Sequence, residues 1–366
     1  MNIKQLFTSI LCMACLSVSA ANAVIPDMKF RRLDARDGLS NSQINYMFQD
    51  SRGFIWIGTS YGLNRYDGYR FRTYYSDPSD STTLRNNYVD QIWEDGDGKL
   101  WLKQGMNYSV FDPVTEKVTR NPTTILSKWG IKGGIDRFYI DSQKRFWVKT
   151  YDEGLYCYNP RKKTHKLIKY GYDADQINKE YYFSNFAEWN DKLLVTSSDG
   201  DIMAIDGDKG KVLWKDDFMK THGGQPSQAY YCYVDKHSNY WILATNRLFI
   251  FNQKDKVWYS SLNDYLATFG IAPLAPDLQA WDVCMDQRGW IWLATDHYGI
   301  YVIDTKNAEI KQFVNNKFDA TSISENTQKK LMLDKSGNMW IACYRNGLNQ
   351  YIEKLMGFNT LELGDI

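Results

Sequence analysis

The stretch QDSRGFIWIGTSYGLNRYDGYRF, residues 49–71, contains the pattern that decides the fold. It places Asp50 six residues before Trp56, with Gly53 between them. The same separation recurs in five further pairs: Asp95 and Trp101, Asp141 and Trp147, Asp235 and Trp241, Asp286 and Trp292, and Asp334 and Trp340. A seventh, degenerate copy has Leu193 near the Trp position. The six Trp residues and Leu193 lie 45 to 51 residues apart along the chain, a period typical of repeat architectures.

Each repeat unit predicts four short strands. In the first unit, residues 45–49, 54–59, 63–67 and 69–74 alternate or are rich in aromatic and β-branched side chains. The first turn contains Asp50, which can accept hydrogen bonds from turn amides, and Gly53, which tolerates a positive φ. Gly98, Gly289 and Gly337 repeat this glycine, whereas Lys144 and Ser238 replace it in two copies. The pattern indicates antiparallel hairpins.

Four strands in about 45 residues make one blade of a β-propeller. Seven copies therefore predict an all-β, seven-bladed β-propeller of four-stranded antiparallel blades over residues 24–366. Residues 28–32 match residues 69–73 in pattern, so the mature chain begins with an outer strand that lacks its own blade. We expect this N-terminal strand to complete blade seven. Residues 356–358 (Met-Gly-Phe) are the alternative closing strand.

Residues 1–23 have the features of a signal peptide. Lys4 precedes an apolar run over 6–18, and Ala21-Asn22-Ala23 has the form of a cleavage site. No later run is long and apolar enough to span a membrane, so we expect an exported, periplasmic protein with no direct membrane span. Lipid anchoring at Cys15 is the less favoured alternative, because the residues before it make a poor lipobox.

The composition excludes several classes of protein. A net charge of +1 over 366 residues gives no electrostatic signature of nucleic-acid binding. The four cysteines after the leader (157, 232, 284 and 343) lie in apolar runs without CxxC spacing, which predicts buried thiols and no zinc site. The four histidines (165, 222, 237 and 297) do not cluster. We therefore expect neither a metal nor a cofactor.

Three segments resemble the two-component regulator propeller repeat: DSRGFIWIGTSYGLNRYD at 50–67, DQRGWIWLATDHYGIYVID at 286–304 and DKSGNMWIACYRNGLNQY at 334–351. GLSNSQINYMFQD before the first also has that family's form. The resemblance implies the periplasmic sensor region of hybrid two-component systems of Bacteroidetes, which govern polysaccharide utilisation. Family members continue into a second propeller, a membrane helix and a histidine kinase. This chain resembles the first propeller alone.

The repeated Asp and Trp residues resemble the Asp-box of sialidases, which stabilises a hairpin away from catalytic centres. A glycosidase needs two placed carboxylates, and no local motif here selects such a pair. Residues 94–98 (Glu-Asp-Gly-Asp-Gly) resemble the start of a calcium loop but lack the remaining ligands. We interpret them as the first hairpin turn, and we expect no enzymatic activity.

Ligand recognition is expected in the residues that vary between repeats. The hairpins between second and third strands and the connections between blades should emerge on one face of the ring. Aromatic rings there can stack on sugars, while Arg and Asp can pair with hydroxyl or acidic groups. The candidate ligand-binding residues are Tyr61, Tyr151, Asp152, Arg247, Trp281, His297, Tyr298, Tyr344 and Arg345.

The favoured function is a non-catalytic sensor propeller that responds to glycan fragments, with an oligosaccharide as its ligand. The alternative is a structural or docking propeller without a small ligand, whose partner is a second propeller, a sensor kinase region or another protomer. A carbohydrate-active enzyme, either glycosidase or lyase, is the third hypothesis.

Overall fold

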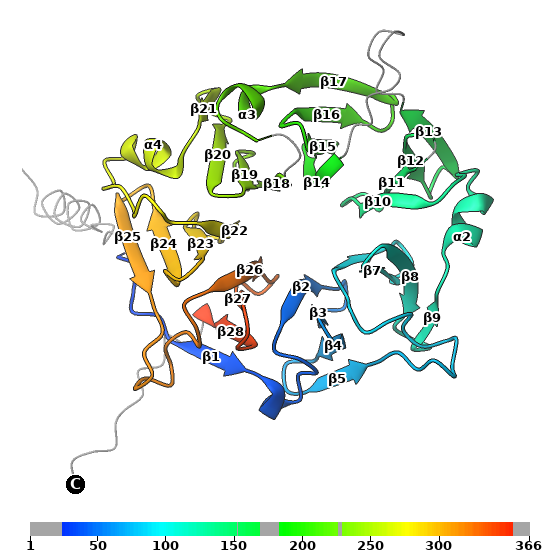
Figure 1. Cartoon of the computed structure of the whole chain (residues 1–366), viewed down its shortest axis with the longest axis horizontal. Coiled ribbons are helices and arrows are strands. Elements are labelled where there is room, and N and C mark those ends of the chain that lie inside the picture. Colours follow the sequence, from blue (N-terminus) through cyan, green and yellow to red (C-terminus); the bar gives the residue numbers. More distant parts are fainter. Residues whose placement is uncertain (1–23, 152, 169–182, 226–228, 354–366) are drawn as a thin grey trace, which may run out of the picture.

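Seven four-stranded antiparallel sheets are arranged around a central axis in the computed structural model (Figure 1). The structure describes residues 24–151, 153–168, 183–225 and 229–353. The predicted seven-bladed β-propeller is therefore confirmed. The predicted leader (1–23) and the alternative closing segment 356–358 both lie outside the described residues.

In blades one to six the strands follow chain order, from the inner strand facing the axis to the outer strand at the rim. Blades one to three consist of β2 (Ile44–Gln49), β3 (Ile55–Thr59), β4 (Gly62–Tyr66) and β5 (Phe71–Tyr74); β6 (Gln91–Glu94), β7 (Leu100–Gln104), β8 (Asn107–Asp112) and β9 (Lys117–Thr119); and β10 (Ile135–Ile140), β11 (Phe146–Thr150), β12 (Leu155–Asn159) and β13 (Thr164–Ile168). Blades four and five consist of β14 (Phe183–Trp189), β15 (Lys192–Ser197), β16 (Ile202–Asp206) and β17 (Lys211–Asp216); and β18 (Tyr231–Val234), β19 (Tyr240–Ala244), β20 (Arg247–Asn252) and β21 (Val257–Tyr259). Blade six consists of β22 (Ala280–Met285), β23 (Ile291–Thr295), β24 (Ile300–Asp304) and β25 (Glu309–Phe313).

Blade seven is assembled from both ends of the chain. Its inner strands are β26 (Gln328–Leu333), β27 (Met339–Cys343) and β28 (Leu348–Tyr351), and its outer strand is β1 (Phe30–Leu33). The register pairs Phe30 with Tyr351 and Leu33 with Leu348. In Figure 1 the blue β1 lies beside the red β28. Closure by the N-terminal strand is thus confirmed.

An arginine clamp reinforces this closure. The Arg32 guanidinium donates to the carbonyl oxygens of Ser322 (3.0 Å) and Asp319 (3.1 Å) in the connection between blades six and seven. Arg120 holds the connection between blades one and two in the same way, through the carbonyls of Thr83 (3.0 Å) and Asp77 (2.9 Å). We call the pairing of β1 with β28 the seam. The seam is thus held by the same kind of arginine contact that holds two blades consecutive in the chain.

The Asp-to-Trp unit has the structural role predicted for it. In blade two, Asp95 accepts hydrogen bonds from the backbone amides of Asp97 and Lys99 (both 2.9 Å) and from the Trp101 indole (3.0 Å). The same indole bond occurs in all six copies, and the six tryptophans are at most 2% exposed. One carboxylate thus fixes both the turn and the packing residue of the next strand.

Where glycine is missing from this turn, the backbone keeps the glycine-type conformation. Lys144 and Ser238 have φ of 63° and 62°, close to the 75° of Gly98. In the degenerate blade four, a tighter turn with Asn190 and Asp191 at φ of 46° and 61° replaces the Asp-containing turn. Asparagine and aspartate tolerate this left-handed region better than most residues.

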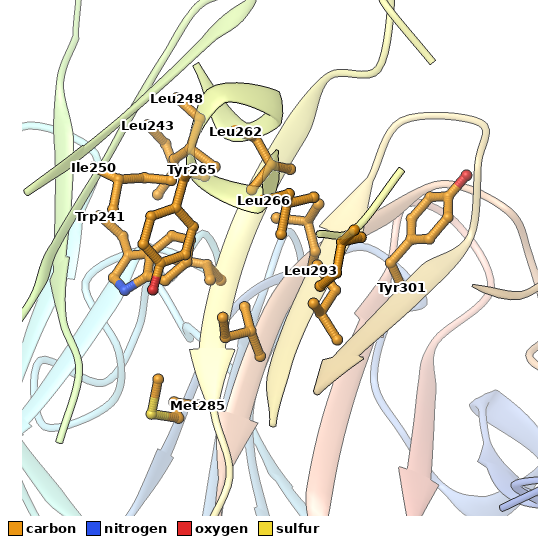
Figure 2. Close-up of a cluster of buried hydrophobic side chains, with 14 residues drawn as sticks. Trp241, Leu243, Leu248, Ile250, Leu262, Tyr265, Leu266, Met285, Leu293 and Tyr301 are labelled. Atoms are coloured by element: carbon orange, nitrogen blue, oxygen red, sulfur yellow. The ribbon is translucent and has the colours of Figure 1, made fainter. Parts of the chain in front are cut away.

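Hydrophobic clusters fill the spaces between neighbouring blades. Figure 2 shows the cluster between blades five and six, where Trp241 from β19 and Leu293 from β23 are buried. Helix α4 (Leu262–Ala267) closes this cluster from outside, and its Tyr265 meets Trp241 edge to face at 5.4 Å. Because each blade is covered on both faces, β3 and β23 are buried at every position instead of alternating.

The sequence did not predict the short helices. Besides α4, the connections contain α2 (Thr123–Lys128), α3 (Phe218–Thr221) and a single 3-10 turn at Ala35–Asp37. They bury only a few side chains, such as Leu126 and Met219, so they leave no long helical period in the sequence.

Candidate functional site

The hairpins between second and third strands meet the connections between blades on one face of the ring, which we call the hairpin face. The Tyr344 amide donates to the Thr327 carbonyl (3.0 Å), and the Asp296 amide donates to the Gln279 carbonyl (3.0 Å). These bonds join each of the two hairpins to the residue that precedes the inner strand of its own blade. The Asp-to-Trp turns lie at the opposite ends of the strands, on what we call the Asp-box face.

A central channel with a volume of about 1130 Å³ opens at the hairpin face. All seven inner strands contribute to its wall, and Figure 1 shows them around the axis. Its polar lining residues include Asp90, Lys103, Asn185, Asp282 and Lys330. The channel is large enough for a small ligand, since such sites usually enclose about 300–1,000 Å³.

Five inner strands have an irregularity at the same point, near the mouth of the channel. The pairing of inner and second strands skips one residue there: Asn45, Asp136, Ser184, Trp281 and Lys329. A β-bulge of this kind bends the strand and redirects a side chain. Four of the five, all except Asp136, line the channel. Five of the seven blades therefore have a bulged residue near the mouth, and its identity differs from blade to blade.

Aromatic and cationic side chains gather at the mouth between blades six and seven. We call Trp281, Lys329, Tyr344 and Arg345 the mouth cluster. The Trp281 and Tyr344 rings meet edge to face with centroids 5.9 Å apart. The Lys329 ammonium lies 5.2 Å from the Tyr344 ring centroid, and the Arg345 guanidinium lies 5.0 Å from it. Both distances are within the range of cation–π contacts.

Two other lysines of the channel are paired with carboxylates. Lys330 lies 3.7 Å from Asp282, which also accepts a hydrogen bond from the Leu331 amide (2.9 Å). Burial raises the pKa of Asp282, and the Lys330 ammonium opposes this effect only in part. On the far side of the channel, Lys103 pairs with Asp90 at 3.6 Å.

Three of the nine predicted binding residues, Trp281, Tyr344 and Arg345, are thus brought together. Of the three, Trp281 lines the channel itself. The other described candidates lie apart from this cluster and do not line the channel. Tyr61 is 55% exposed and packs against Tyr75, while Tyr151 is 57% exposed. Arg247 is exposed at the start of β20. Asp152 lies outside the described residues.

His297 and Tyr298 make local contacts. The His297 Nδ1 lies 2.9 Å from Asp296, and the Tyr298 hydroxyl donates to Asp277 (2.7 Å). The hydrogen bond to Asp277 raises the pKa of Tyr298. Both residues remain candidates for contact with a larger ligand that extends over the hairpin face.

Sequence reasoning missed Lys329. Its only signal is the pair Lys329-Lys330, which does not stand out because β10 has two charges, Asp136 and Arg137, at the same positions. The bulge that turns Lys329 toward the channel cannot be recognised from a single sequence.

Among the described residues, no group of three or more His, Cys, Asp or Glu side chains is placed to hold a metal ion. No helix among them has the length and apolar character required to cross a membrane. Their four cysteines are all unpaired, and burial raises the pKa of Cys157, Cys284 and Cys343 to about 12.

Comparison with known proteins connects this geometry to a family. Residues 38–61, which cover the first inner strand and the first Asp-to-Trp turn, match the family described as "Two component regulator propeller". This segment is therefore similar to one repeat of that family. The histidine kinase P4 of Formosa agariphila is 38% identical to the chain over 69 residues, which are 19% of this chain and 5% of that protein.

Solved structures share the propeller fold. The extracellular domain of a hybrid two component system from B. thetaiotaomicron matches with a TM-score of 0.64 and 21% identity, over 88% of this chain and 42% of that one. A streptogramin B lyase matches with a TM-score of 0.56 and 13% identity, over 88% of this chain and 97% of the other. The chain therefore spans less than half of that extracellular domain and a small part of the kinase.

Proposed function

We propose that this propeller is a non-catalytic, periplasmic sensor module of a two-component signalling system and that it binds glycan fragments at the mouth of its channel. The mouth cluster is the observation that carries this proposal. Trp281 lines a channel of about 1130 Å³ and meets the ring of Tyr344 edge to face. Aromatic side chains combine a large apolar surface with polar groups nearby, which suits the mixed surface of a sugar. The family match and the extracellular sensor domains that share the fold support the same role.

Calorimetry with a panel of neutral and acidic oligosaccharides tests this proposal. We expect at least one to bind, and Trp281→Ala and Tyr344→Ala each to weaken binding about tenfold, which corresponds to about 1.4 kcal/mol. Tyr69→Ala is the matched control, because Tyr69 is 91% exposed in the turn before β5. Failure of the whole panel to bind would refute the proposal. Cleavage of a bound sugar would replace it by an enzymatic function.

One observation favours docking as a second function. Tyr61, Tyr75, Tyr88 and Met106 are 43–83% exposed and all lie at the hairpin face of blades one and two. Exposed apolar groups gathered on one face are typical of protein contacts. We propose a second propeller or protomer as the partner. Light scattering of the chain and of Met106→Asp tests this: a dimer that the variant dissociates supports it, and a monomer at high concentration contradicts it for self-association.

A further inference from the structure

Lys329 and Arg345, the two cations of the mouth cluster, differ from Lys103 and Lys330 in having no carboxylate partner in the part of the chain that the structure describes. Lys103 and Lys330 each have a carboxylate within 4 Å. Among the described residues, no carboxylate lies within ion-pair distance of Lys329 Nζ or of the Arg345 guanidinium. Both cations instead lie over the ring of Tyr344.

The acidic groups that surround this cluster are already engaged. Asp282 pairs with Lys330, and Asp296 lies beside His297 and accepts from the Thr327 hydroxyl (3.2 Å). Glu325 accepts a hydrogen bond from the Arg345 backbone amide (2.9 Å), which fixes the hairpin without pairing the guanidinium. Each neighbouring carboxylate thus has another partner.

The placement of the two cations is also specific. Lys329 is the bulged residue of β26, and Arg345 is at the tip of the hairpin after β27, so two separate elements of blade seven bring them to one ring. Trp281, the bulged residue of β22, contributes an aromatic surface from blade six. Two cationic side chains therefore lie beside a pair of aromatic rings.

We infer that the mouth cluster selects glycans that bear an anionic group, a carboxylate or a sulfate, which Lys329 and Arg345 bind while the sugar ring packs on Trp281. This inference rests on the proposed function and specifies its ligand class. Arg can hold a carboxylate or sulfate through two parallel hydrogen bonds, and Lys acts as a point charge. Lys329 is half-buried, so its contact is strengthened relative to bulk water, whereas Arg345 is exposed.

The test compares charged probes with their neutral counterparts by calorimetry on the full chain. The probes are trigalacturonic acid beside galactotriose, and lactose 6′-sulfate beside lactose, so that carboxylate and sulfate are distinguished. The test variant is Lys329→Gln with Arg345→Gln, which removes both charges and keeps polar side chains. The control variant is Arg161→Gln with Lys254→Gln, because these residues are exposed in turns away from the channel.

We expect one charged probe to bind about tenfold more tightly than its neutral counterpart, with an advantage that decreases as salt is added. The double variant at the mouth should lose this advantage and the control should keep it. Equal affinity for charged and neutral probes, or an advantage that survives the mouth variant, overturns the inference. If neutral probes bind and Trp281→Ala weakens them, the proposed function remains while the anionic preference fails. If no sugar binds at all, both fail.

Discussion

Replacing Asp95 by alanine removes an acceptor from three hydrogen bonds at once. Two come from the backbone amides of Asp97 and Lys99, and the third comes from the Trp101 indole, which is 1% exposed. Water can reach the turn amides, so each of those bonds contributes about 1 kcal/mol. The buried indole is left without a partner at a cost of about 1–3 kcal/mol. We expect Asp95→Ala to lower the free energy of unfolding by about 4 kcal/mol.

Asp95→Asn separates these contributions. The amide oxygen can still accept from the turn, but the NH₂ group would face the indole N–H, donor against donor. A loss of about 2 kcal/mol is expected, chiefly from the indole. Asp97→Asn is the matched control, because Asp97 is exposed in the same turn. The assay is urea unfolding followed by circular dichroism. The reasoning is refuted if Asp95→Ala costs no more than the control.

Three further predictions concern the turns and the seam. Ser238→Gly should raise the free energy of unfolding by about 0.5–1 kcal/mol, since Ser238 has a φ of 62° that glycine adopts without strain, and Gly98→Ala should lower it by about 1 kcal/mol, both measured by urea unfolding. Burial raises the pKa of Glu94, but hydrogen bonds from Ser51 and the nearby Lys144 ammonium outweigh this and leave it below its usual value. The stability that Glu94 contributes is therefore present at neutral pH and lost as pH falls through the lowered pKa, so the gap between wild type and Glu94→Gln in urea unfolding should shrink on acidification; a constant gap would contradict this. Arg32→Ala should speed hydrogen exchange of the β1 amides with little effect on blade three, and uniform protection in the variant would show that the clamp is dispensable.

Most of the fold could be predicted from the sequence because its main signal is local and repeated. A single Asp-to-Trp unit predicts one hairpin, and the number of times the unit recurs predicts the number of blades. Leu193 was enough to place the degenerate blade, since β15 aligns it with Ile205 in the position that Trp occupies elsewhere. Closure by residues 28–32 was predictable for the same reason, because they repeat an outer-strand pattern.

The candidate site was predictable only in part, because it depends on residues from different blades. The hairpin positions of Tyr344 and Arg345 follow from the repeat. Lys329 depends on a bulge that shifts the side-chain direction by one residue, and one such shift reverses which face a side chain occupies. That Lys329 meets Tyr344 and Trp281 depends further on how tightly the blades curve around the channel.

The closure of blade seven has a consequence for folding kinetics. Arg32 and Ser322 are 290 residues apart in the chain. During synthesis β1 therefore stays unpaired until β28 has been made. Contacts of such long range slow folding, and an open ring leaves the edge of β28 free to pair with another molecule. Once closed, the seam resists unfolding because β1, β28 and the arginine clamp must separate together. We therefore expect this propeller to fold slowly, to aggregate when closure is delayed, and to persist for long periods once the first strand has met the last.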